Sequence, residues 1–383
     1  MDFQKIPLSW NEKTLAVNYF ITKIDIEPVS ESEKPTEIKS DSLVTIRFYH
    51  YENDNEYLTY PGSFLYKINK LKNKIIELKI FYQNDKNTFL HFFKVQEKIR
   101  LDIYHYGFSY QKNIPTSLTF DKLKTATFDK VLKSVLKPIN WDFLLKIDEN
   151  PFYNIRLDSF ANTIKNQICG NSFRVDGAPD EYDRFVLIKN QQIQREGSVG
   201  FNHNGFVKAI ADYIYKKRKN SNTGLMIEDL KVRHLDLRGQ KLAKKFEYVR
   251  DPFFGLDWIR NIALQLSGKD TTRADQYDVI NIPKIAQLDM YGYHVQDIFF
   301  ISYYLTKQNP GNIFFFSINQ ETGSKPVLKH FTHAGLLIPY FKNKKLVIRI
   351  FTANKEINVY EFIRQYYKDN IFLVRVNISD IIY

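Results

Sequence analysis

The hydrophobic pattern of the first 115 residues has the two-residue alternation of β-strands. Runs rich in β-branched and aromatic residues are separated by polar breaks, and the break at residues 83–87 is typical of a hairpin loop. Short strands at this spacing are typical of a small sandwich or barrel. We therefore expect a β-rich N-terminal domain over residues 1–115, with strands at 15–26, 43–51, 74–81, 88–95 and 99–106.

The pattern changes to a helical period after this domain. Thr127 has the character of an N-cap, apolar residues follow at three- and four-residue spacing, and Pro138 ends the run. We expect residues 116–150 to form a helical linker. The remainder, residues 151–383, mixes both periods. It predicts helices at 206–215, 256–266, 294–307 and 359–367, and strands at 312–318, 331–340, 345–351 and 371–378.

Composition limits the class of protein. The 44% hydrophobic and 15% aromatic content is too high for a mainly disordered chain. The net charge of +12 attracts polyanions in general. The densest basic run, residues 216–219, ends a predicted helix, where cations suit the dipole, so we expect a solvated helix end. Nucleic-acid motifs are not apparent, and we expect no nucleic-acid partner.

The sequence shows no run of 18 apolar residues, so we expect no transmembrane segment. The first residues lack the basic and apolar regions of a signal peptide, which leaves a cytoplasmic protein or a mature exported form. The single cysteine, Cys169, excludes an intramolecular disulfide. It follows an apolar-periodic helix and precedes Gly170. Because a helix C-terminus raises a thiol pKa, we expect a structural role for Cys169.

One short stretch carries the candidate chemistry. Residues 200–207, Gly-Phe-Asn-His-Asn-Gly-Phe-Val, lead into an apolar-periodic helix. The turn delivers Asn202, His203 and Asn204 to the helix N-terminus. Free N–H groups and the helix dipole favour negative charge there, and enzymes use such a position to make a cysteine thiolate.

This stretch resembles the Asp-Cys-Ser-Gly-Phe-Val signature of NlpC/P60-type cell-wall peptidases, which have a papain-like fold. Residues 310–316, Pro-Gly-Asn-Ile-Phe-Phe-Phe, resemble the family's Pro-Gly-Asp-Leu-x-Phe-Phe strand. Residues 332–338, Thr-His-Ala-Gly-Leu-Leu-Ile, resemble its His-x-Gly-Ile strand. The resemblance implies an α+β, papain-like domain over residues 151–383. Residues 216–309 exceed what the family places between its helix and its sheet, so we expect a helical insertion there.

The resemblance also assigns roles to residues. His203 falls at the nucleophile position and His333 at the general base, and the next strand offers Arg349 or Thr352 as the third residue. A cation such as Arg349 disfavours the imidazolium that the mechanism needs. Because an imidazole cannot simply replace a thiolate, we expect a catalytically inactive member without a cofactor. Its groove, formed by Asn202, His203, Asn204 and His333, would bind peptidoglycan stem peptide or an envelope protein, in the periplasm or cell envelope.

Two alternatives stay open. In the first, the protein is an active cell-wall hydrolase that uses His203 and His333, with or without a bound metal. Two histidines without a carboxylate at clear spacing do not define a metal site, and we expect none. In the second, it is a structural or assembly protein with a vestigial groove. His330, three residues before His333, is expected on the opposite face of its strand.

Overall fold

The computed structural model divides the chain into two compact units, Met1–Ile147 and Asp148–Tyr383, and each is described by itself. It describes residues 74–381, apart from 84, 124–125, 127, 148–149, 196, 198, 239–249, 269–272, 323–327 and 353. Of residues 1–73 it describes only the backbone of 19–27, 43–52, 55–57 and 64–69.

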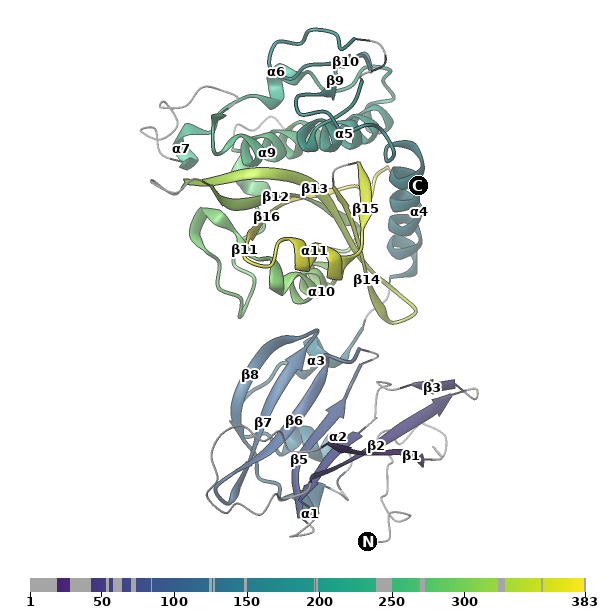
Figure 1. Cartoon of the computed structure of the whole chain (residues 1–383), viewed down its shortest axis with the longest axis vertical. Helices are drawn as coiled ribbons and strands as arrows, with labels where there is room; N and C mark the ends of the chain where they lie inside the picture. The colour runs from purple at the N-terminus through teal and green to yellow at the C-terminus, as the bar shows by residue number, and fades with distance from the viewer. Residues whose placement is uncertain are drawn as a thin grey trace. The chain divides into compact units, whose positions relative to one another are not determined.

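The N-terminal unit is built on one antiparallel sheet, in the order β1-β2-β4-β5-β6-β7-β8 with β3 beside β2 (Figure 1). The predicted alternation is real: Ile99, Leu101 and Ile103 of β7 all point into the core. Among the described residues the strands form one sheet, whereas we expected a small sandwich or barrel from the strand spacing. Its strands are β1 (Tyr19–Glu27), β2 (Leu43–Glu52), β3 (Asn55–Tyr57), β4 (Phe64–Asn69), β5 (Lys74–Phe81), β6 (Phe89–Val95), β7 (Lys98–His105) and β8 (Phe108–Pro115).

Three short helices cover the apolar side of this sheet, where a sandwich would have its second sheet. They are α1 (Phe120–Leu123), α2 (Phe128–Lys133) and α3 (Trp141–Leu145). Their buried residues Leu123, Val131 and Leu144 share one hydrophobic cluster with the strands. The three helices of the segment that we expected as a linker, 116–150, are therefore part of the unit's core, because the sheet face needs an apolar cover. The expected N-cap, Thr127, lies outside the described residues.

The C-terminal unit contains a six-stranded antiparallel sheet in the order β11-β16-β12-β13-β14-β15. The strands predicted at 331–340 and 345–351 are paired as a hairpin, because Lys342 and Lys345 are the last pair between β13 and β14. The strands are β11 (Tyr293–His294), β12 (Asn312–Thr322), β13 (Leu328–Lys342), β14 (Lys345–Thr352), β15 (Lys355–Ile357) and β16 (Asn370–Asn377).

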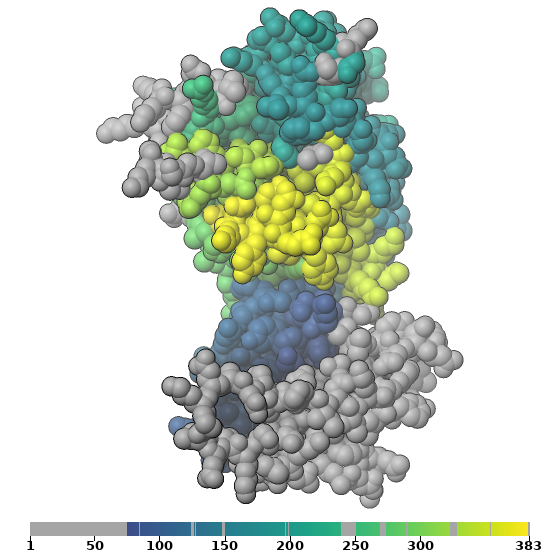
Figure 2. Space-filling view, in the orientation of Figure 1, coloured from purple at the N-terminus to yellow at the C-terminus, as the bar shows by residue number. Residues whose placement is uncertain are grey.

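Helices cover both faces of this sheet (Figure 1). On one face lie α4 (Pro151–Gln167), α5 (His203–Lys219) and α9 (Phe254–Ser267), and on the other lie α10 (Ile298–Gln308) and α11 (Val359–Gln365). The C-terminal part of the chain, with α11 and β15, forms much of the visible surface of this unit (Figure 2). Shorter elements are β9 (Ala178–Pro179), β10 (Phe185–Val186), α6 (Ile227–Leu230), α7 (Leu235–Arg238) and the 3₁₀ turns Ala274–Tyr277, Asp289–Tyr291 and Val295–Asp297. The chain thus has the mixed helix and strand content of an α+β protein.

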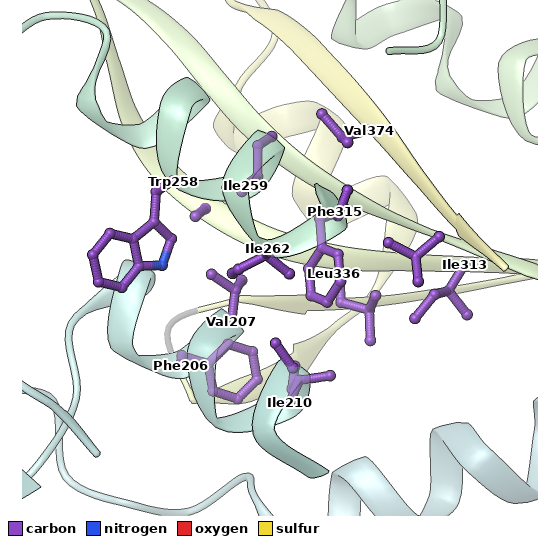
Figure 3. Close-up of a cluster of buried hydrophobic side chains, with 14 of the residues drawn as sticks. Phe206, Val207, Ile210, Trp258, Ile259, Ile262, Ile313, Phe315, Leu336 and Val374 are labelled. Atoms are coloured by element: carbon purple, nitrogen blue, oxygen red, sulfur yellow. The ribbon is translucent and has the colours of Figure 1, made fainter. Parts of the chain in front are cut away.

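The core of this unit lies between α5, α9 and the sheet (Figure 3). Gly268 ends α9 in a left-handed conformation, which glycine adopts without strain. We expected residues 216–309 to be an insertion. They contain α9, and because the apolar face of α9 is buried against the strands, they supply much of the core. The side chains in contact are Phe206, Val207 and Ile210 of α5, Trp258, Ile259 and Ile262 of α9, and Ile313, Phe315, Leu336 and Val374 of the sheet.

Among the described residues, no helix is both long enough and apolar enough to cross a membrane.

Candidate functional site

The start of α5 is fixed by its own side chains. Asn202 is the N-cap, and its side-chain oxygen accepts a hydrogen bond of 2.7 Å from the backbone N–H of Gly205. A Cβ atom at Gly205 would lie 1.9 Å from the carbonyl oxygen of Gly177. Only glycine therefore lets the helix start pack this closely on the chain before β9. The close packing explains why the sequence signature has a glycine at position 205.

The structure brings His203, His333 and Thr352 together. The rings of His203 and His333 meet edge to face, with their centroids 4.4 Å apart and an angle of 69° between their planes. Nδ1 of His203 lies 3.2 Å from the hydroxyl oxygen of Thr352. Both rings are half-buried, whereas Thr352 is buried. Residues from a helix start and from two strands, far apart in sequence, therefore form one cluster.

The edge of β13 explains why the helix start reaches this place. β14 pairs with β13 only from Gly335 to Lys342, so residues 328–334 of β13 extend beyond the end of β14. The exposed edge is covered by other groups: Pro252 accepts a hydrogen bond from the N–H of Phe331. The ring of His203 lies at the same edge, where it hydrogen-bonds the backbone carbonyl of Ala334. Its ring therefore also has a structural role at the strand edge.

A β-bulge in β13 changes which histidines share a face. Ile318 pairs with His333 and Gln320 pairs with His330, while the register shifts between them at Thr332. Because Ile318 and Gln320 are two residues apart, their partners lie on the same face. Our expectation that His330 faces away from His333 is therefore wrong, because simple alternation does not allow for the extra residue.

His333 is held by residues that sequence reasoning missed. Its Nδ1 atom lies 2.7 Å from the hydroxyl of Thr332, which donates to the side-chain oxygen of Gln320. Gln320 in turn donates to the carboxylate of Asp369 at 2.7 Å. The ring of Tyr366 lies 5.5 Å from that of His333. Thr332 is within the motif, but nothing in the sequence places Gln320 or Asp369 beside it.

Both imidazoles are neutral at neutral pH. Burial and, after it, the charge of the neighbouring His333 lower the pKa of His203 to about 4, against the hydrogen bond with Ala334. Burial also lowers the pKa of His333, opposed by the charge of Asp369. In the described part of the chain, no group of three or more His, Cys, Asp or Glu residues is placed to hold a metal ion.

The other predicted groove residues are placed differently. Asn202 is half-buried, and its amide donates to the carbonyl of Val175. Asn204 is buried, and its backbone carbonyl accepts a hydrogen bond from the indole of Trp258. The exposed ring of Phe173 packs edge-on against His203, with centroids 5.5 Å apart. The accessible part of the cluster is therefore the histidine pair with Phe173, and not Asn204.

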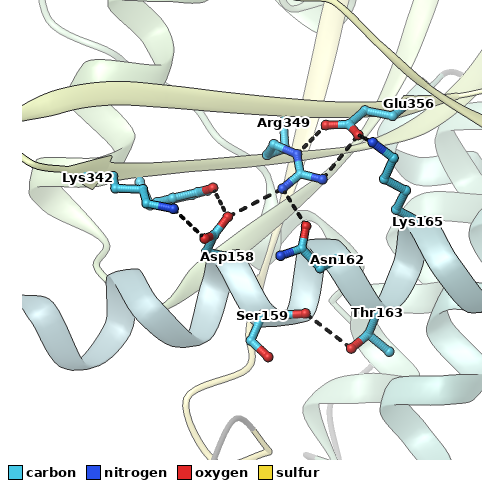
Figure 4. Close-up of polar contacts among 9 residues, drawn as sticks. Asp158, Ser159, Asn162, Thr163, Lys165, Lys342, Arg349 and Glu356 are labelled. Carbon is cyan, nitrogen blue, oxygen red and sulfur yellow. Dashed lines mark hydrogen bonds and ion pairs between the residues drawn. The ribbon is translucent and has the colours of Figure 1, made fainter.

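Arg349, the other candidate for the third residue, belongs to a separate polar network (Figure 4). Its guanidinium pairs with Glu356 and Asp158 and hydrogen-bonds Asn162. These contacts join α4 to β14 and β15. The side chain of Arg349 therefore stabilises the packing of α4 on the sheet. Of the two candidates for the third residue, Thr352 is the one that contacts the histidine pair.

Cys169 lies just after the end of α4, where the sequence predicts a helix C-terminal position. Burial raises the pKa of its thiol to about 11, and the charge of Glu356 adds to this shift. Such a thiol is almost entirely protonated at neutral pH and is a poor nucleophile.

Comparison with known proteins gives a match in the N-terminal unit. Residues 26–143 match the family model described as "Domain of unknown function (DUF8515)". No curated protein and no solved structure matches the chain.

Proposed function

We propose that the C-terminal unit is a catalytically inactive, NlpC/P60-like module with a papain-like fold. It binds peptidoglycan stem peptide, or a protein partner of the cell envelope, without cleaving it. The observation that carries the proposal is the edge-to-face pair of His203 and His333 at the start of α5. In the family that the motifs resemble, these two positions hold the nucleophile and its base.

The absence of a thiol at the helix start supports an inactive module. The chain's one cysteine has a raised pKa and follows a different helix. A neutral imidazole at position 203 makes no stable acyl intermediate, so the covalent route of a cysteine peptidase is lost. Binding capacity remains, because ring nitrogens, the helix start and the exposed Phe173 ring form one surface.

Cosedimentation with purified peptidoglycan tests the proposal. The wild-type chain is expected to pellet with the polymer and to release no soluble muropeptides. The double variant His203→Ala/His333→Ala is expected to pellet less. The matched control Arg364→Ala, which removes an exposed cation on α11, is expected to bind as the wild type does. Failure of the wild-type chain to pellet would remove the peptidoglycan proposal.

A structural role for the cluster is the second candidate, because His203 already has partners within the protein. Its ring contacts the hydroxyl of Thr352 and the backbone of Ala334. If the groove is vestigial, the double variant lowers stability but leaves binding to any envelope partner unchanged. Measuring both quantities on the same variants separates the two candidates.

A further inference from the structure

The hydrogen bonds around the histidine pair fix which ring nitrogens carry protons. The chain of hydrogen bonds from His333 through Thr332 and Gln320 ends on the carboxylate of Asp369. An ionised carboxylate only accepts hydrogen bonds. The Gln320 amide nitrogen must therefore face Asp369, at 2.7 Å, and its oxygen must face Thr332. Thr332 donates its one hydroxyl proton to that oxygen, at 2.8 Å. The bond between Thr332 and Nδ1 of His333 therefore needs the proton on Nδ1.

The same argument applies to His203. The hydroxyl of Thr352 donates to the carbonyl of Ala334 at 3.3 Å, and a carbonyl only accepts. Nδ1 of His203 must then donate to Thr352, at 3.2 Å. In a neutral ring, a proton on Nδ1 leaves Nε2 with a free lone pair. Both rings therefore take the same tautomer.

These lone pairs are available to a ligand. Neither Nε2 atom has a hydrogen-bond partner within the described residues. Both histidines are half-buried, so part of each ring stays accessible. The rings are 4.4 Å apart, and aromatic rings adjoin both of them, Phe173 beside His203 and Tyr366 beside His333. The pair is thus a double acceptor with aromatic neighbours.

We propose that this pair recognises a single nitrogen that carries at least two N–H bonds, such as an amine or a primary amide of the bound peptide. The inference rests on the proposed function and names the ligand group that the site selects. Two acceptors on rings whose centroids are 4.4 Å apart can share one nitrogen with two donors, whereas a secondary amide offers one donor. A metal ion is disfavoured because no third ligand is placed beside the two rings among the described residues.

Nitrogen NMR of the histidine rings tests the tautomers without any ligand. At neutral pH, His203 and His333 are expected to show a protonated Nδ1 and an unprotonated Nε2. Thr332→Val removes the acceptor of His333 and is expected to shift that ring towards the other tautomer. Thr163→Val, which removes a hydroxyl bond on the exposed face of α4, leaves both rings unchanged. A protonated Nε2 on either ring in the wild type would overturn the inference.

Binding of modified peptides tests the ligand group. The probes are a soluble stem peptide with a free side-chain amine, the same peptide with a primary amide there, and its N-acetyl and N,N-dimethyl forms. The amine or the primary amide is expected to bind at least tenfold more tightly than the last two. Whichever of the amine and the primary amide binds more tightly identifies the nitrogen group that the site recognises. Equal affinity for all four, or binding abolished by a chelator, contradicts this inference while the proposed function stands. No binding by any of them counts against the proposed function itself.

Discussion

His203 Nδ1 lies 3.2 Å from the hydroxyl of Thr352, although 149 positions separate the two residues in the sequence. The contact joins the start of α5 to the last residue of β14, where β13 loses its neighbour. Thr352→Val keeps the shape of the side chain and removes the hydroxyl. We expect a loss of about 1–2 kcal/mol in the free energy of unfolding of the C-terminal unit, because the hydroxyl makes two hydrogen bonds, with His203 and with the carbonyl of Ala334.

Urea denaturation of this variant measures that loss. Thr163→Val serves as the control, because the hydroxyl of Thr163 donates a hydrogen bond within its own helix, to the exposed carbonyl of Ser159 (Figure 4). Equal stability of Thr352→Val and the wild type would show that the histidine cluster contributes little to holding α5 on the sheet.

Acid is expected to destabilise the C-terminal unit through His203. Its pKa is lowered from about 6.5 to about 4, so the unfolded chain takes up a proton at a pH where the folded one does not. The stability is fully present above pH 6.5 and is lost as the pH falls towards 4, by about 3 kcal/mol in all. The lowered pKa of His333 acts in the same direction.

The variant His203→Asn isolates this effect from other titrating groups, such as Asp212, whose raised pKa has the opposite sign. The difference in unfolding free energy between wild type and variant, measured at pH 7 and at pH 4.5, is expected to shrink at the lower pH. A difference independent of pH would contradict the burial of a neutral ring at position 203.

A thiol at position 203 is expected to be more reactive than the native one. His203→Cys in a Cys169→Ser background places a thiol at a helix N-terminus, where the dipole lowers its pKa. Cys169, with a pKa raised to about 11, is the comparison. We expect alkylation by iodoacetamide at pH 7 to be faster at position 203 by about tenfold or more. Equal rates would show that the position does not activate sulfur as it does in cysteine peptidases.

A buried ion pair in α5 gives a further prediction. Nζ of Lys208 lies 2.7 Å from Asp212, and both side chains are buried. Asp212 also accepts a bond from the N–H of Leu225. Lys208→Met leaves an uncompensated buried carboxylate and is expected to cost about 3–5 kcal/mol of stability.

The double variant Lys208→Met/Asp212→Asn keeps the bond to Leu225 without a charge and is expected to recover more than half of that loss. Lys133→Met breaks an exposed pair with Asp129 at the same spacing and is expected to leave stability nearly unchanged. A double variant as unstable as the single one would contradict the importance of the unpaired charge.

Local sequence patterns predict much of the secondary structure. The helix start at residues 202–204 and the strands at 331–340 and 345–351 depend on neighbouring residues, and the structure contains all of them. The assignment of residues 116–150 to a linker was wrong for a physical reason. Helical periodicity shows that a segment has an apolar face, but not which surface that face covers.

The candidate site is predicted only in part. The motifs single out His203 and His333, and the structure places their rings together. The partners of His333 depend on the bulge at Thr332 and on the packing of the chain after α11, which brings Asp369 beside Gln320. Such long-range contacts are set by tertiary packing, and a single sequence does not encode them in any short spacing. The papain-like assignment remains a proposal.

The most direct test of the account follows the ring signals of His203 and His333 by NMR while soluble stem peptide is added, with mass spectrometry of the peptide from the same sample. The account predicts that both rings shift in a saturable manner and that the peptide stays intact. Unchanged rings at saturating peptide, or cleavage products in the sample, would contradict it.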